Sequence, residues 1–178
     1  MASSIRCRFR GGMPLPSTTP RPRFSPEIAR IAATEIVAEL IKGGHLTEAE
    51  REQSVDDIAE HAKPYDDGYE LAQRLDDYAG WDCDFMMSEM LNGFSWACSE
   101  AIAEAQKKWA SETNQQPHLP IGTRVSFGDG ERGEITGIYE HGAAQYLVKV
   151  DGDKDADGPH ESRRIVNFEG VEAETESA

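Results

Sequence analysis

The stretch from Ile121 to Val150, IGTRVSFGDGERGEITGIYEHGAAQYLVKV, carries the clearest structural pattern in the chain. Val125 and Phe127 alternate with polar residues, which is the two-residue period of a strand with one apolar face. The following GDGERG supplies glycines that tolerate positive φ, as a tight connection between antiparallel strands requires. The pattern predicts three more strands, over residues 133–140, 146–150 and 163–168.

Four or five short strands in about fifty residues cannot bury both faces of an open sheet, so they are predicted to curl into a small antiparallel β-barrel. The spacing of G-T-R-V, G-x-I and Y-x-V-x-V resembles that of Src-homology-3-like barrels of the Tudor and KOW kind, over residues 119–171. This resemblance implies a module that binds peptides, proteins or nucleic acid. The fold alone does not choose among these ligands.

Residues 25–113 are predicted to form a bundle of four or five helices, which makes the chain an α+β protein in two parts. Ser25-Pro26 is typical of a helix start, and Gly43-Gly44 is typical of a helix end. Ile28, Ile31 and Ile36 are expected on the inward stripe of this first helix.

Thr47 and Glu50 have the spacing of a capping box, which predicts the start of a second helix that ends before Pro64. A third helix is predicted over residues 66–79, with Tyr69, Ala72, Leu75, Tyr78 and Ala79 facing inward. The last helix is predicted from Phe94 to about Ser111 with Ser95 as its cap. If Gly93 does not break the chain, this helix joins the preceding apolar segment as one long helix.

The first 24 residues are rich in arginine, proline and serine and are predicted to be a disordered basic arm. Three interpretations of the arm remain open: a transit peptide, a chain whose translation starts at Met13, or an arm that grips nucleic acid. Residues 114–118 are predicted to be a linker between the two parts. Residues 172–178 are predicted to be an acidic tail.

The net charge of −15 is unevenly distributed along the chain. Residues 1–24 hold five bases and no acid, residues 25–118 hold twenty acids and seven bases, and residues 119–178 hold thirteen acids and six bases. Such an acidic surface repels nucleic acid and membrane phosphates and attracts basic partners. The alternative is that the acidity only keeps the protein in solution.

No apolar run approaches the roughly eighteen residues that a membrane span needs. The three cysteines have neither metal-ligand nor redox spacing and suit a reducing compartment. We therefore expect a cytoplasmic location and no membrane partner.

Two kinds of residue are candidates for binding a partner. The first kind is the acids of the second and third predicted helices. The second is the tryptophans of the segment from Trp81 to Trp96, which is rich in aromatic residues and methionine and holds too many of them for one buried face. The candidate partner-binding residues are Asp56, Asp57, Glu60, Asp66, Asp67, Glu70, Asp76, Asp77, Trp81 and Trp96.

Asp153, Asp155 and Asp157 have a spacing that resembles the first half of an EF-hand calcium loop, with Gly158 at its sixth position. The twelfth position is Arg164 instead of a bidentate glutamate, and the flanks are predicted strands, so a solvated loop is preferred to a calcium site. The chain has no phosphate-binding glycine loop and no nucleophile elbow. We therefore expect no enzymatic activity and no cofactor.

The organisation of residues 68–109, followed by the predicted barrel, resembles small accessory proteins of phages, prophages and plasmids. On this resemblance we expect a non-enzymatic acidic protein that binds and inhibits a basic host protein of nucleic-acid handling or defence, with carboxylates in the place of phosphates. The alternative is a nucleic-acid-associated regulator that uses the arginine-rich arm and the barrel. Direct nucleic-acid binding is expected only through the arm.

Overall fold

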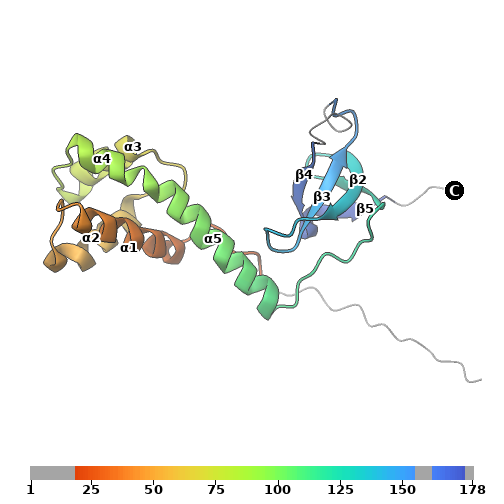
Figure 1. The fold of residues 1–178 in the computed structure, drawn as a ribbon, viewed down its shortest axis with the longest axis horizontal. Helices are drawn as coiled ribbons and strands as arrows, with labels where there is room; N and C mark the ends of the chain where they lie inside the picture. The colour runs from red at the N-terminus through yellow and green to blue at the C-terminus, as the bar shows by residue number, and fades with distance from the viewer. Residues whose placement is uncertain (1–18, 155–161, 175–178) are drawn as a thin grey trace, which may run out of the picture.

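The computed structural model describes residues 19–154 and 162–174. Figure 1 shows a group of helices followed in the chain by a small sheet, as an α+β chain requires. The helical part contains α1 (Pro26–Lys42), the 3-10 turn η1 (Glu48–Glu50), α2 (Arg51–His61), α3 (Gly68–Arg74), the π-helical turn η2 (Leu75–Ala79), α4 (Phe85–Leu91) and α5 (Gly93–Glu112). In the described ranges no helix is both long and apolar enough to cross a membrane.

The predicted start and end of α1 are confirmed. The Ser25 hydroxyl accepts the backbone N–H of Ile28 at 3.3 Å, Pro26 is the first helical residue, and Gly43 follows the last one. The predicted inward position of Ile31 is wrong, because its side chain is 54% exposed. Helix α1 instead buries alanines and Val37 on the side where α2 and α5 pack.

The predicted third helix turns from α-helical to π-helical geometry at Leu75, and this change explains why Tyr78 does not face inward as predicted. Asp67 caps its start, and Leu71, Ala72 and Leu75 are buried. In a π-turn each backbone hydrogen bond spans one more residue than in an α-helix. The next residue on the same helix face as Leu75 is therefore one position further along the chain than in an α-helix. Ala79 consequently packs against the core, whereas Tyr78 is 71% exposed. Tyr69, also predicted inward, is 69% exposed.

Helices α4 and α5 are separate but nearly consecutive. Asn92 ends α4 and immediately precedes α5, which begins at Gly93. The predicted Ser95 cap is therefore wrong: Ser95 lies within α5, and its hydroxyl donates to the carbonyl of Pro64 at 3.3 Å. Phe94, with no exposed surface, joins Leu40, Ile58 and Leu91 in the single core of the helical part.

The sheet is antiparallel and open. Its strands are β1 (Arg124–Phe127), β2 (Glu131–Ile138), β3 (Gln145–Val150), β4 (Arg164–Asn167) and β5 (Val171–Ala173), in the order β4-β3-β2-β1-β5. The predicted closed barrel is wrong, because closure requires pairing of the two outer strands, and among the described residues β4 and β5 do not pair. Both are short, and the 3-10 turn η3 (Phe168–Gly170) carries the chain from one edge to the other.

Strand β5 occupies part of the predicted acidic tail. Glu172 and Ala173 pair with β1, and Val171 is buried in the core of the sheet beside Val125 and Phe127. The carboxylate of Glu174 lies 3.3 Å from Nε of Arg132, which neutralises part of the acidic end. The tail prediction is therefore wrong for residues 172 and 173, and residues 175–178 lie outside the described ranges.

Residues 19–24, predicted to belong to a disordered arm, instead lie along α5 (Figure 1). The indole N–H of Trp109 donates to the carbonyl of Thr19 at 3.0 Å, and the amide of Gln106 donates to the carbonyl of Pro22 at 2.9 Å. The arm prediction for residues 1–18 falls outside the described ranges.

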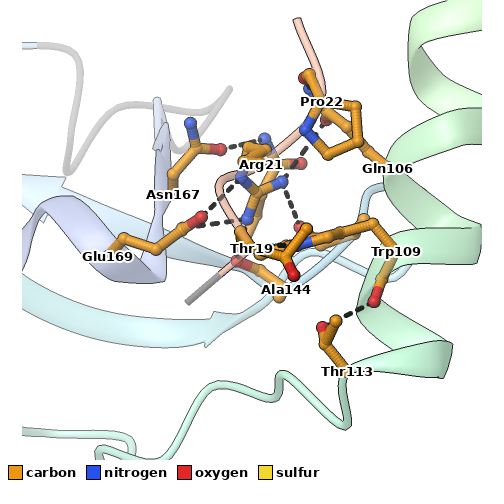
Figure 2. Close-up of polar contacts among 11 residues, drawn as sticks. Thr19, Arg21, Pro22, Gln106, Trp109, Thr113, Ala144, Asn167 and Glu169 are labelled. Carbon is orange, nitrogen blue, oxygen red and sulfur yellow. Dashed lines mark hydrogen bonds and ion pairs between the residues drawn. The ribbon is translucent and has the colours of Figure 1, made fainter. Parts of the chain in front are cut away.

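The Arg21 side chain, 7% exposed, joins the helical part to the sheet (Figure 2). Its guanidinium donates to both carboxylate oxygens of Glu169, at 2.8 and 3.0 Å. It also donates to the carbonyls of Ala143 and Ala144, at 2.7 and 3.1 Å, and its central carbon lies 4.9 Å from the centre of the Trp109 ring. One cation thus contacts α5, the β2–β3 connection and η3.

Replacing Arg21 with glutamine is expected to weaken the attachment of the sheet to α5 by about 1.5–3 kcal/mol, the usual contribution of hydrogen bonds to a charged group. The two cores do not involve Arg21, so the far-UV circular dichroism spectrum should not change. Small-angle scattering should show a larger radius of gyration, and proteases should cleave residues 113–123 faster. Arg23→Gln, at an exposed position, is the control. Equal cleavage rates for the two variants would contradict the expectation.

Candidate interaction surface

Three of the eight predicted acids, Asp66, Asp67 and Asp76, accept hydrogen bonds from backbone N–H groups within the helical part, and only Asp66 of the three is buried. The Asp66 carboxylate is buried, accepts the backbone N–H of Lys63 at 2.6 Å and forms an ion pair with Arg74. Asp67 caps α3 by accepting the N–H of Glu70 at 2.8 Å. Asp76 accepts the N–H of Cys83 at 2.9 Å and so fixes the connection to α4.

Two further predicted residues of the surface are tied to each other. The indole N–H of Trp81 donates to Oδ2 of Asp57 at 2.8 Å, and the side-chain amide of Gln53 donates to Oδ1 of the same carboxylate at 2.7 Å. Trp81 is half-buried against the core of the helical part. Asp56 forms an ion pair with Arg30 on α1. These contacts explain why Trp81 and Asp57 lie together although 24 residues separate them.

The remaining predicted acids, Glu60, Glu70 and Asp77, are exposed. Within the described part of the chain none of their carboxylates forms an ion pair or a side-chain hydrogen bond. Carboxylates without internal partners can bind a basic partner without first breaking a contact inside the protein. Among the eight predicted acids, these three are therefore the ones whose carboxylates have no partner within the described residues.

Glu70 and Asp77, together with Lys63 and Arg74, line a shallow depression of about 700 Å³ between the α2–α3 connection, α3 and η2. Tyr65 and Tyr78 also line it, and they are 91% and 71% exposed. We call this surface the tyrosine depression. The sequence pattern did not indicate this depression, because the helical period placed Tyr78 in the core and no pattern gave Tyr65 a role. The sequence did contain a sign that Tyr65 is exposed. This tyrosine lies between Pro64 and two aspartates, and an aromatic residue in such a polar loop is seldom buried.

The aromatic and methionine cluster from Trp81 to Trp96 divides between core and surface. Met87 and Phe94 are buried, whereas Phe85, Met86 and Trp96 are 73%, 56% and 63% exposed. Trp96 thus stays a candidate for partner contact. The prediction that the cluster holds too many large residues for one buried face is confirmed.

Neither described cysteine is suited to nucleophilic chemistry. Burial raises the pKa of the Cys98 thiol to about 11. Burial, together with the neighbouring carboxylate of Asp76, raises the pKa of the Cys83 thiol to about 12. At neutral pH both groups are therefore protonated thiols and not the reactive thiolates.

The loop whose spacing resembles a calcium loop falls largely outside the described ranges. Asp153 is described, but Asp155 and Asp157 are not, so the preference for a solvated loop over a calcium site stays a prediction. Among residues 19–154 and 162–174, no three histidine, cysteine, aspartate or glutamate side chains come together as metal ligands.

Comparison with protein-family models, with curated proteins and with solved structures found no match to this chain.

Proposed function

We propose that this protein is a non-enzymatic acidic interaction protein, and that its helical part binds a basic protein partner through the tyrosine depression and the acids around it. The observation that carries the proposal is the exposure of Tyr65 and Tyr78 beside the carboxylates of Glu70 and Asp77. Exposed tyrosines supply large contact areas at little cost in side-chain entropy. Unpaired carboxylates beside them select a partner of positive charge.

The charge of the helical part supports a basic partner. Residues 25–118 carry thirteen more acids than bases. A field of this sign accelerates encounter with a cationic surface and disfavours direct contact with phosphates. A protein that itself binds nucleic acid has such a cationic surface, so we propose a host protein of nucleic-acid handling or defence, inhibited by carboxylates that occupy its phosphate sites. An origin in a phage or another mobile element belongs to the same proposal.

The sheet is proposed to be a second binding module, related to the Src-homology-3-like folds. Five short antiparallel strands within residues 124–173 support that relationship, as an open sheet and not a closed barrel. The alternative role as a nucleic-acid-associated regulator depends on the arginine-rich arm. Arg21 is committed to Glu169 inside the protein, which leaves Arg6, Arg8, Arg10 and Arg23 for that role.

Substituting lysine at Glu60, Glu70 and Asp77 together is expected to weaken partner binding at least tenfold, because it replaces attraction by repulsion. The measurement is retention of partners by the tagged full-length chain from cells of the organism that encodes it, at low and at high salt. A matched control carries lysine at Glu134, Glu140 and Glu172, which are exposed residues of the sheet part. Both variants change the net charge equally.

Loss of a protein partner in the first variant alone would support the proposal. Equal loss in both variants would show a non-specific effect of net charge and would contradict it. Retention of nucleic acid by the wild-type chain, abolished by nuclease and by removal of residues 1–18, would favour the regulator instead.

A further inference from the structure

A groove of about 1300 Å³ lies between α1, α5 and the segment 20–25, apart from the tyrosine depression. Its apolar lining comes from Ile28 and Ile31 on α1 and from Ala97, Ala101 and Ala105 on α5. The three alanines are four residues apart, so they form one stripe along α5. Ala97 is buried in the core of the helical part, but Ala101 and Ala105 are half-buried, and their small side chains let another backbone approach α5 closely.

Ile31 is the residue that most needs an explanation in this groove. Its side chain is 54% exposed although it lies on the same helix as seven buried apolar residues. A branched apolar side chain that stays half in water forgoes stabilisation of roughly 1 kcal/mol, on the usual scale for burial of such groups. Contact with a partner would cover it.

Acids stand on both sides of this apolar lining. Glu27 and Glu35 come from α1, and Glu100 and Glu104 come from α5. Within the described residues, Glu27, Glu35 and Glu100 form no ion pair, whereas Glu104 pairs with Lys107 at 2.7 Å. Three bases also line the groove: Arg21 and Arg23 in the segment 20–25, and Lys108 on α5. Arg21 is already bound by Glu169, and Lys108 lies 3.9 Å from Glu112.

We infer that this groove binds an amphipathic helix of a partner protein, with the apolar stripe of that helix on Ile31 and the alanines and its lysines or arginines beside the acids. From Ala97 to Lys108, α5 presents eleven helical steps to the groove, about 16 Å, which matches three turns of a docked helix. A helix in an apolar groove with charged rims is a common mode of peptide recognition. The inference rests on the basic partner proposed above but places it on a different surface.

The test uses two fluorescent peptides of eighteen residues and the full-length protein. Both peptides carry leucine at positions i, i+3, i+4 and i+7; one has lysine and arginine on the flanks of this stripe, and the other has glutamate. Fluorescence anisotropy should show binding of the basic peptide and at least tenfold weaker binding of the acidic one.

Ile31→Lys should weaken binding of the basic peptide by tenfold or more, since it removes an apolar anchor and adds a like charge. Because Ile31 is half exposed, the variant should remain folded, which its circular dichroism spectrum checks.

A triple variant, Glu27→Gln with Glu35→Gln and Glu100→Gln, keeps the shape of the groove and should lose affinity mainly at low salt. Glu134→Gln with Glu140→Gln and Glu172→Gln, at exposed positions of the sheet part, is the matched control and should bind the peptide normally.

Unchanged binding by Ile31→Lys, or equal binding of the two peptides, would overturn the inference. Tighter peptide binding after Arg6, Arg8 and Arg10 are changed to glutamate would also overturn it, because the occupant would then be this chain's own N-terminal segment. A different result would contradict the proposed function: the variant with lysine at Glu60, Glu70 and Asp77 would still bind the native partner.

Discussion

Replacing Asp66 with alanine is expected to lower the free energy of unfolding by about 3–5 kcal/mol, because it leaves a largely buried charge without its partner. The Asp66 carboxylate is 5% exposed and pairs with Arg74, whose own side chain is 21% exposed. Arg74 also donates from Nε to the carbonyl of His61 at 2.9 Å and so holds the end of α2. Removal of the carboxylate also takes the acceptor from the N–H of Lys63. Urea denaturation followed by circular dichroism measures the loss.

Asp77→Ala is the matched control, since Asp77 is exposed and lies eleven residues further along the same segment. A surface substitution of this kind changes stability by no more than about 0.5 kcal/mol. If Asp66→Ala and Asp77→Ala unfold at the same urea concentration, the structural role of the pair is refuted. If they differ as expected, charge reversal at Asp66 cannot separate binding from folding, which is why the binding test uses Glu60, Glu70 and Asp77.

Gly68→Ala is expected to be nearly as damaging, with a loss of about 3 kcal/mol or more, at the upper end of overpacking effects. A Cβ atom at position 68 would lie 1.9 Å from the carbonyl oxygen of Ser88 and 2.6 Å from the backbone nitrogen of Asn92. These are backbone atoms of α4 and its end, so they cannot move aside as the tip of a side chain can. The N–H of Gly68 also donates to the side chain of Asn92 at 2.7 Å. Helices α3 and α4 would have to separate.

Gly170→Ala provides the comparison for this substitution. A Cβ atom at position 170 meets no atom within 4 Å, and the residue does not have positive φ. Thermal unfolding should therefore show a large fall in the melting temperature for Gly68→Ala and almost none for Gly170→Ala. A melting temperature for Gly68→Ala equal to that of the wild type would mean that α3 and α4 are not held as closely as the structure shows.

Local patterns predicted the ends of the helices well. The Ser25 cap, the end of α1 at Gly43 and the capping box of Thr47 with Glu50 all stand where the sequence indicates. Each depends on hydrogen bonds between residues a few positions apart, so the necessary information lies within one short segment. The first three strands were predicted for the same reason, from alternation and turn residues.

The candidate site was predicted less well because acids of one type take different roles in the fold. Asp66 and Asp77 are both aspartates in the same acidic segment, yet one is buried beside Arg74 and the other is exposed. Nothing within a few residues of either distinguishes them. The packing of α2 against α3 distinguishes them, because Arg74 on α3 joins the end of α2 to the Asp66 carboxylate, whereas Asp77 stays in water.

The sequence by itself determined the α+β order, the positions of the caps and turns, and the excess of acids in the helical part. Only the tertiary structure decided that the π-turn at Leu75 exposes Tyr78, that β5 adds to the edge of the sheet, and that Arg21 joins the two parts. Arg21 and Glu169 are 148 residues apart, so no local pattern could pair them. Contacts between distant segments depend on how whole faces pack, and a one-dimensional pattern does not contain that information.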